Sequence, residues 1–408
     1  MSVRRETELL VPAGSLEVLK VAIRYGADAV YIGGEAFGLR AKAKNFSLEE
    51  MAEGIQFAHA RGKRVFVTAN ILAHNYDMEG VREYFAKLRE IKPDALIIAD
   101  PGVYDIAMEV CPEIERHIST QANNTNYGTC LFWYRQKAKR IVTARELSLG
   151  EIRELREKIP EDMEIESFVH GSMCISYSGR CLLSNFLTGR DANKGACTHP
   201  CRWKYSLMEE ERPGEYFPVF ENERGTYIFN SKDLCMIEHI PEILEAGIDS
   251  LKIEGRMKNA LYVATVARTY RKAIDDFKKS PDEYQKNMNW YREQIGNCTY
   301  REFTTGFFFG KPGSEEQIYD SNTYKREAIY LGIVRGVDDK GRVVLEQKNK
   351  FCTNDTIEIM KPDGRNLKAK VLGIYNAEGE MQESAPHSKQ ELHVELSQLP
   401  EEMDVLRM

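Results

Sequence analysis

The most informative residues of this sequence are its cysteines. Nine are present, and five of them fall between positions 174 and 235. These five are Cys174, Cys181, Cys197, Cys201 and Cys235. None of them forms the tight C-x-x-C pairs of a zinc ribbon, whereas iron–sulfur clusters are commonly held by four thiolates whose spacing varies. Free cysteines are often simple core residues, but five thiols on polar, glycine-rich segments indicate a bound metal or cluster.

Polar side chains follow many of the short apolar runs, and these form a second group of candidates. In a parallel barrel the carboxyl ends of the strands converge on one mouth, where functional residues gather. His170 is the most suggestive of them, because it directly precedes the cysteine segment and its ordinary pKa suits proton transfer. For each residue the alternative is a polar side chain that merely begins a loop. The full set is Asn70, Asp100, Gln121, Arg145, Glu146, His170, Glu254 and Arg256.

Basic and aromatic residues are interleaved around the same cysteines. Such side chains grip phosphates and stack on bases, although they also suit a small carboxylate ligand or a solvated face. The net charge of −7 excludes a uniformly basic nucleic-acid coat but not a local basic patch. The residues concerned are Arg180, Arg190, Lys194, Arg202, Lys204, Lys252, Arg256 and Lys258, with Trp203 and Tyr205 between them.

Short apolar runs alternate with helical periodicity over the first 255 residues. This alternation predicts a parallel sheet, and eight units predict a TIM-type (β/α)8-like barrel, with an open doubly wound sheet as the rival. Ser47 and Glu50 have the spacing of a capping box at the start of one helix. The expected strands are 8–14, 28–34, 64–70, 94–100, 116–121, 140–146, 164–171 and 249–255, and the expected helices include 15–26, 47–62, 79–90, 148–159 and 259–277.

The pattern changes after about residue 280, which predicts more than one domain. We expect the TIM-like barrel over 1–280 with a cysteine-rich insertion at about 170–235, and a polar linking segment over 281–325. Residues 326–408 alternate in short runs separated by turn residues, which predicts a small antiparallel β-barrel. No apolar run is long enough to span a membrane and the N-terminal stretch lacks a signal-peptide pattern, so we expect a cytoplasmic protein with reduced thiols.

Three segments resemble one known family. They are "ELLVPAGSLEVLKVAIRYGADAVYIGG", "ESFVHGSMCISYSGRCLLSNFLTGRDANKGACTHPCRWKY" and "NSKDLCMIEHIPEILEAGIDSLKIEGRMK". Together they are similar to the collagenase-like peptidase family of unassigned mechanism, the U32 type, and E-x-F-x-H-G-x-x-C-x6-C is close to its signature. With the appended small barrel, the sequence most resembles members that hydroxylate the tRNA wobble uridine at carbon 5 in a prephenate-dependent way.

This resemblance implies a cofactor and partners. It implies a [4Fe–4S] cluster held by Cys174, Cys181, Cys197 and Cys235, with Cys201 as the alternative to Cys235. It further implies prephenate as co-substrate, tRNA as substrate, and a paralogous subunit as a further partner.

Strand-end position suggests roles for four residues in such an enzyme. Arg145 and Arg256 would pair with co-substrate carboxylates in bidentate geometry. His170 and Glu254 would transfer protons.

The sequence is also compatible with other functions. The family label suggests a protease, but the sequence holds neither an H-E-x-x-H zinc motif nor an evident nucleophile with a base partner. Other relatives hydroxylate ribosomal RNA or the ubiquinone ring. A binding scaffold with structural zinc is a further alternative, which metal analysis would separate from an iron–sulfur enzyme.

Overall fold

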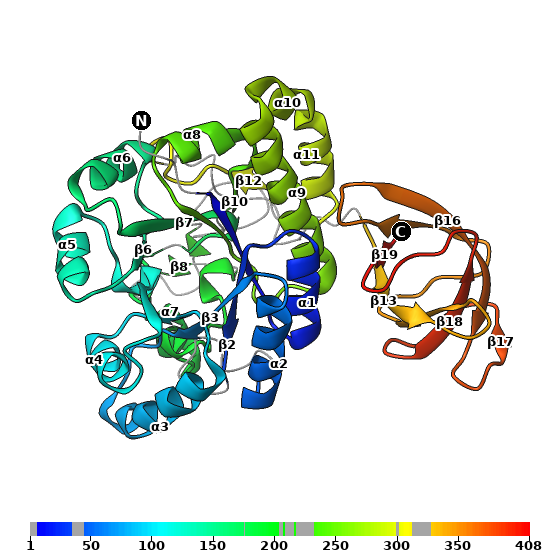
Figure 1. Cartoon of the computed structure of the whole chain (residues 1–408), viewed down its shortest axis with the longest axis horizontal. Coiled ribbons are helices and arrows are strands. Elements are labelled where there is room, and N and C mark those ends of the chain that lie inside the picture. The colour runs from blue at the N-terminus through cyan, green and yellow to red at the C-terminus, as the bar shows by residue number, and fades with distance from the viewer. Residues whose placement is uncertain are drawn as a thin grey trace. The chain divides into compact units, whose positions relative to one another are not determined.

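The structure is a computed structural model that divides into two compact units (Figure 1). One unit comprises residues 1–19, 28–257 and 300–324, and the other comprises residues 20–27, 258–299 and 325–408. Lys204 and Tyr205 lie outside the residues that the structure describes. The described residues are 6–34, 45–174, 176–203, 207–208, 216–217, 232–298, 302–311 and 328–408.

The first unit is built on a closed barrel of eight parallel strands, which confirms the predicted TIM-like fold. The strands pair in chain order from β1 to β7, and β11 pairs with both β7 and β1. Ser250 of β11 stands opposite Glu8 on one side and Glu166 on the other, so the sheet has no open edge there. The strands are β1 (Glu8–Pro12), β2 (Ala29–Gly33), β3 (Arg64–Ala69), β4 (Ala95–Ile98), β5 (Glu115–Ile118), β6 (Arg140–Val142), β7 (Glu164–Ser172) and β11 (Ser250–Ile253).

A helix follows each of these strands along the chain, and Figure 1 shows α2 to α6 around the outside of the strands. The predicted capping box is confirmed, because Ser47 Oγ accepts from Glu50 N at 3.2 Å and Ser47 N donates to Glu50 Oε2 at 3.1 Å. The helices are α1 (Leu16–Arg24), α2 (Leu48–His59), α3 (Asn75–Ile91), α4 (Pro101–Val110), α5 (Tyr127–Arg135), α6 (Leu149–Lys158), α8 (Ile240–Glu245) and α9 (Ala260–Lys279).

The cysteine-rich insertion separates β7 from α8. It holds the short helix α7 (Leu183–Thr188), the 3-10 turns η2 (Ala192–Lys194) and η3 (Pro200–Arg202), and the strand pair β8 (Leu207–Met208) and β9 (Tyr216–Phe217). The segment returns to the barrel through β10 (Asp233–Cys235), which runs antiparallel to β7 and pairs on its other side with β12 (Phe303–Thr304). This antiparallel addition was not predicted, because three residues carry too little periodicity to be recognised as a strand.

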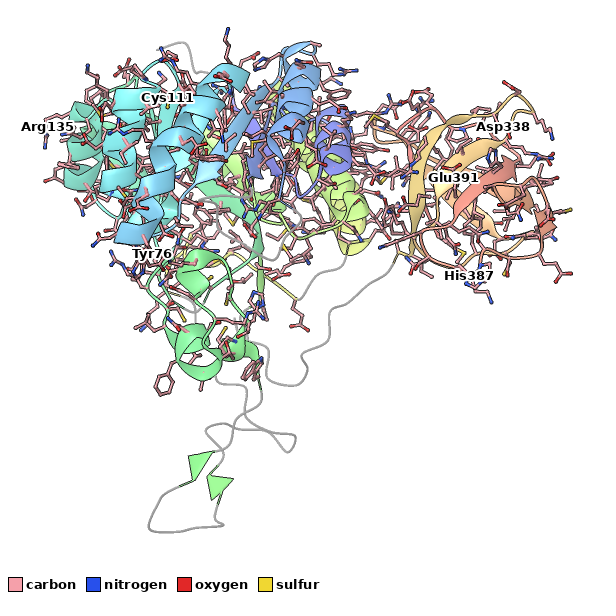
Figure 2. The ribbon with its side chains drawn as sticks, turned by 90° about the horizontal axis from the view of Figure 1, so that it is seen from below. Tyr76, Cys111, Arg135, Asp338, His387 and Glu391 are labelled. Atoms are coloured by element: carbon pink, nitrogen blue, oxygen red, sulfur yellow. The ribbon has the colours of Figure 1, made fainter. Side chains whose placement is uncertain are left out.

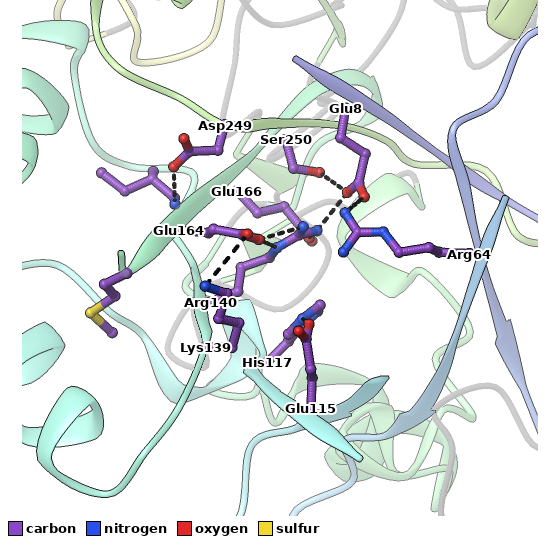
Figure 3. A network of polar contacts seen from close by, with 12 residues as sticks. Glu8, Arg64, Glu115, His117, Lys139, Arg140, Glu164, Glu166, Asp249 and Ser250 are labelled. Carbon is purple, nitrogen blue, oxygen red and sulfur yellow. Dashed lines mark hydrogen bonds and ion pairs between the residues drawn. The ribbon is translucent and has the colours of Figure 1, made fainter. Parts of the chain in front are cut away.

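A buried network of charges occupies the interior of the barrel (Figure 3). Arg140 of β6 is 1% exposed and donates to Glu8 of β1 at 2.6 Å and to Glu166 of β7 at 2.9 Å. It also donates to Glu164 at 2.7 Å, and Lys252 of β11 donates to Glu166 at 2.7 Å. Arg64 of β3 completes the set through Glu8. Three carboxylates therefore face three cations, and the network joins five strands.

This network shifts the pKa of its carboxyl groups. Burial by itself would raise the pKa of Glu8, but the charges of Arg140 and Arg64 lower it from 4.5 to about 2. The pKa of Glu166 is also lowered, because Lys252 and Arg140 outweigh the opposing effect of its burial. Both carboxylates therefore stay ionised in the barrel interior.

The second unit contains a closed six-stranded antiparallel barrel, as predicted for the C-terminal region. The strand order is β15-β19-β13-β14-β18-β16, and pairing of β15 with β16 closes it. The short strand β19, which was not predicted, is needed for this closure. The strands are β13 (Tyr330–Val337), β14 (Val343–Glu346), β15 (Thr356–Met360), β16 (Asn366–Tyr375), β18 (Glu391–Leu396) and β19 (Val405–Arg407), with β17 (Met381–Gln382) attached to β16.

Segments from elsewhere in the chain complete this second unit. The Tyr25 hydroxyl donates to the Met360 carbonyl at 2.6 Å and accepts from Val405 N at 3.0 Å. From α9, Arg268 donates to the Lys361 carbonyl at 2.9 Å. The stretch 281–325, predicted to be a link, contains α10 (Pro281–Lys286), α11 (Met288–Gly296) and β12.

Within the described ranges, no helix has both the length and the apolar character needed to cross a membrane.

The charge network predicts the stability of one variant. Arg140→Met leaves three carboxylates, two of them buried, with two cations, so the free energy of unfolding should fall by about 3–5 kcal/mol in urea titrations. Lowering of the Glu8 pKa stabilises the wild type above about pH 4.5, and this contribution is lost as the pH falls toward 2. The difference between wild type and variant should therefore shrink across that window.

A matched control is Arg82→Met, which removes the exposed ion pair of Arg82 with Glu109 at 2.7 Å. This change should leave the free energy of unfolding nearly unchanged, because exposed pairs contribute little. Equal effects of the two substitutions would show that the buried network does not stabilise the barrel.

Candidate active site

A cavity of about 440 Å³ lies at the carboxyl ends of the barrel strands. Its volume is in the range of small-molecule sites, and its place is where barrels of this type carry their active sites. The ends of β6 and β11 supply charged side chains, and the ends of β3 and β5 supply uncharged polar ones. The lining includes Asn70, Ser119, Gln121, Arg145, Lys252, Glu254 and Arg256, together with Cys174, Cys181, Cys197 and Cys201.

Arg256 is a buried cation in the cavity wall. Its Nη1 donates to Thr68 Oγ1 at 2.8 Å, and the side chain is 6% exposed. The guanidinium lies directly on Gly33, where a Cβ would clash with Nη1 and would come within 2.9 Å of Cζ. Glycine at the end of β2 is therefore required for this close approach, which fixes a positive charge at the cavity.

Arg145 holds the first cysteine loop. Its Nη1 donates to the Ser172 carbonyl at 3.1 Å and its Nη2 donates to Ser178 Oγ at 3.0 Å, on either side of Cys174. Burial by itself would lower the pKa of Arg145, but attraction to the Cys174 sulfur and a hydrogen bond with it raise the pKa. The guanidinium thus supports the loop and places positive charge beside a thiol.

Glu254 presents a carboxylate to the same cavity. The Tyr31 hydroxyl lies 3.4 Å from its Oε2 and donates to the Ile253 carbonyl at 2.9 Å. The backbone N–H of Glu254 donates to the His170 carbonyl at 2.8 Å. Gly171 has φ +107°, and a Cβ there would come within 2.9 Å of Glu254 Cβ. The glycine of the H-G dipeptide therefore allows β7 and the end of β11 to approach.

Four thiols line the cavity from the insertion. Cys174 is exposed, while Cys181, Cys197 and Cys201 are half-buried, and these four described cysteines lie outside any disulfide. The backbone N–H of His199 donates to Cys197 Sγ at 3.3 Å. In the part of the chain that the structure describes, no three metal-ligating side chains are already gathered around one point. The donor chemistry nevertheless fits an iron–sulfur cluster, which takes thiolate ligands, and metal sites commonly assemble as the metal binds.

The other predicted residues lie elsewhere in the barrel. Cys235 of β10 pairs with His170 of β7, and neither is among the described residues that line the cavity. The His170 ring is buried, with its centroid 5.9 Å from that of Phe303. Asp100 caps α4 by accepting from Gly102 N and Val103 N. Glu146 lies outside the cavity lining, and burial raises its pKa.

Sequence reasoning missed several residues that the structure brings to the cavity. The barrel fold turns the side chains of Tyr31, Thr68, Ser119 and Phe168 into its lining. They lie at or near strand ends like the residues that were named. The sequence prediction considered only a polar residue that follows each apolar run. It therefore left out side chains among the last residues of the strand itself.

The chain is similar to known proteins over nearly its whole length. The model of "Peptidase family U32" matches residues 14–318, and that of the "Peptidase family U32 C-terminal domain" matches residues 326–407. The tRNA hydroxylation protein P1 of Bacillus subtilis is 42% identical over 389 residues, covering 95% of this chain and 91% of that protein.

Two relatives come from Escherichia coli. The tRNA hydroxylation protein P is 37% identical over 419 residues and covers 93% of this chain and 91% of that protein. A 23S rRNA 5-hydroxycytidine synthase is 37% identical over 373 residues, which is 90% of this chain and 53% of that protein. With both parts matched by the family models and with relatives of this similarity along nearly its whole length, the chain belongs to peptidase family U32.

Proposed function

We propose that this protein is an RNA-modifying hydroxylase that acts on tRNA, at carbon 5 of the wobble uridine and with prephenate as co-substrate. The observation that carries the proposal is the barrel-mouth cavity, where thiols, buried cations and a carboxylate meet. The names of relatives matched over nearly the full chain support the same activity. A tRNA substrate also suits a cytoplasmic protein, which we propose as its location.

The cysteines of the insertion would hold a [4Fe–4S] cluster. Cys174, Cys181 and Cys197 are three of the proposed ligands, and Cys235 is the fourth, with Cys201 as the alternative. When bound, such a cluster supplies one-electron redox chemistry beside the cavity. Cys201 lines the cavity with the first three thiols, whereas Cys235 stands on the strand next to β7. Substitution of Cys201 and of Cys235, one at a time, would therefore identify the fourth ligand.

The cations of the cavity would bind the co-substrate. Arg256 donates to Thr68 and packs against Gly33, so its guanidinium is positioned before a ligand arrives. Lys252 of β11 also lines the cavity, and its Nζ lies 4.5 Å from the centroid of the Tyr31 ring. Prephenate carries two carboxylates, and cations of this kind pair with carboxylates through charge-assisted hydrogen bonds. Arg145, whose N–H groups hold Ser172 and Ser178, would chiefly position the Cys174 loop.

Glu254 is the proposed proton acceptor. In the conversion of C5–H to C5–OH, the proton on C5 must leave the ring. A carboxylate in the cavity, with its Oε2 3.4 Å from the Tyr31 hydroxyl, is placed to take a proton from a bound base. His170 would act by positioning Glu254, because the His170 backbone carbonyl accepts a hydrogen bond from the Glu254 backbone N–H.

Exposed aromatic side chains of α3 and of the insertion would contact the RNA. We call Tyr76, Tyr177, Phe186 and Trp203 the aromatic rim; they are 69%, 45%, 86% and 42% exposed. Tyr177 also lines the cavity, and Lys194 lies over the Tyr76 ring at 4.2 Å. Figure 2 places Tyr76 on the side of the barrel unit where α7 lies. Single-stranded nucleic acids stack their bases on such side chains.

The substrate proposal is tested in cells. Deleting the gene together with any paralogue should remove 5-hydroxyuridine-derived nucleosides from tRNA, as measured by mass spectrometry of digested tRNA. A plasmid copy should restore them, and a copy carrying Arg256→Met should not. Unchanged tRNA nucleosides in the deletion strain, with a change in ribosomal RNA or quinone hydroxylation instead, would assign the chain to one of those substrates.

The cluster proposal is tested on protein purified without oxygen. The wild type should be brown, with broad absorption near about 400 nm and matching iron and sulfide contents. Cys174→Ser, Cys181→Ser and Cys197→Ser should each reduce the amount of bound iron. Comparison of Cys235→Ser with Cys201→Ser identifies the fourth ligand. Cys352→Ser, far along the chain from the insertion, is the control that should retain full iron. Colourless protein that contains only zinc would contradict the proposal.

The aromatic rim predicts a defect in RNA binding. Phe186→Ala should weaken tRNA binding about tenfold at fixed salt, within the range expected when one base loses an aromatic partner. Iron content should not change. Phe132→Ala removes an aromatic ring of α5 that is 46% exposed, and it should leave the dissociation constant unaltered. A Phe186 variant that binds tRNA as tightly as the wild type would exclude the rim from the RNA interface.

A further inference from the structure

The neutral part of the cavity contains an amide with an unused acceptor. Gln121 is 5% exposed and lines the cavity, and among the described residues no donor reaches its Oε1. Oδ1 of Asn70, on the neighbouring part of the lining, accepts no hydrogen bond from the described residues either. Burying a carbonyl oxygen without a donor costs free energy. A ligand that brings an N–H group would recover that cost.

Local structure holds the Asn70 amide and the backbone of Gln121 in place. Gln121 lies in the 3-10 turn η1 (Thr120–Ala122) directly after β5, and its backbone N–H donates to Ser119 Oγ at 3.3 Å. The same Ser119 oxygen accepts from Asn70 Nδ2 at 3.2 Å, and Thr120 Oγ1 donates to the Thr143 carbonyl at 3.0 Å. Ser119 is buried, so one hydroxyl joins the ends of β3 and β5. The two carbonyl oxygens therefore belong to a single supported unit.

The first cysteine loop lies against this unit. Gly179, between Cys174 and Cys181, has φ +74°, and a Cβ there would lie 3.3 Å from Gln121 Nε2 and 3.5 Å from Leu72 Cδ1. A larger residue would be strained in conformation and would press on the amide. The loop that carries two proposed cluster ligands is thus in contact with the side chain that has the unused acceptor.

We propose that Gln121 recognises the target base by accepting the N3–H of uracil at its Oε1, with Asn70 and Ser119 positioning it. This inference rests on the proposed function, because it assigns the substrate base to a part of that same cavity. A base that undergoes chemistry at C5 must leave its stack and enter the enzyme, where it is read along its Watson–Crick edge. Uracil presents one donor there, N3–H, between two carbonyl oxygens, and a carboxamide can accept from N3–H and donate to a neighbouring carbonyl.

Different strands supply the cationic and the neutral side chains of the cavity. The cationic residues Lys252 and Arg256 come from the β11 end, and Gln121 and Asn70 come from the β5 and β3 ends. An anionic co-substrate is attracted to the two cations, whereas a neutral base matches the hydrogen-bonding groups of the two amides. Contact between Gly179 and Gln121 keeps the base site next to the thiols.

The test removes the N3–H donor of the base and the Gln121 acceptor separately. Anticodon stem-loop RNAs carry either uridine or 3-methyluridine at the target position, and hydroxylation of each is measured with the wild type and with Gln121→Ala. N3 methylation should lower the wild-type rate at least about tenfold. In the Gln121→Ala enzyme, which starts from a lower rate on uridine, methylation should have little further effect, because partners in one hydrogen bond are not additive.

The control is Asn193→Ala, which removes a cavity-lining amide from the insertion. This variant should keep the full sensitivity to N3 methylation, and iron content should be equal in all three proteins. A methylation penalty as large in the Gln121 variant as in the wild type would overturn the assignment while leaving the hydroxylase proposal intact. Failure of the wild type to modify the uridine RNA at all would instead contradict the proposed function.

Discussion

The buried guanidinium of Arg140 is the interaction on which the barrel depends. It joins Glu8 of the first strand to Glu164 and Glu166 of the seventh, and Lys252 of the last strand meets Glu166 from the other side. These are the strands that must come together for the sheet to close. Removing charges from water is costly, so the network stabilises the fold only when every carboxylate meets its cation. The strand register of this barrel satisfies that condition.

The same strands carry the charged residues of the cavity. Arg145 follows Arg140 beyond the end of β6, and Glu254 and Arg256 follow Lys252 beyond β11. Because the network fixes these strands relative to one another, it also fixes the distances between the side chains that follow. Glycines then allow close approach, with Gly33 under the Arg256 guanidinium and Gly171 against Glu254. Stability at the centre of the barrel and geometry at its mouth therefore have a common cause.

The insertion adds four thiols to the lining of the cavity. Arg145 holds it at Ser172 and Ser178, Gly179 rests on Gln121, and Lys194 forms an ion pair with Asp77 of α3 at 2.8 Å. Through these contacts the thiols line a cavity whose other walls belong to the barrel. The proposed cluster ligands, the cations proposed to bind the co-substrate and the proposed base site then all line this one cavity.

The sequence by itself determined the eight strand and helix units, the C-terminal antiparallel barrel and the grouping of the cysteines. These features follow from local periodicity, capping pairs such as Ser47 with Glu50, and residue spacing, which depend only on near neighbours. Tertiary structure alone decided which strand-end residues meet. Asp100 caps a helix and His170 packs near Phe303, whereas Gln121 reaches the cavity. Strands as short as β10 and β19 also became recognisable only through their partners. The physical reason is that the direction of a side chain depends on strand register and on close backbone approach, and both are set by residues far away in the sequence.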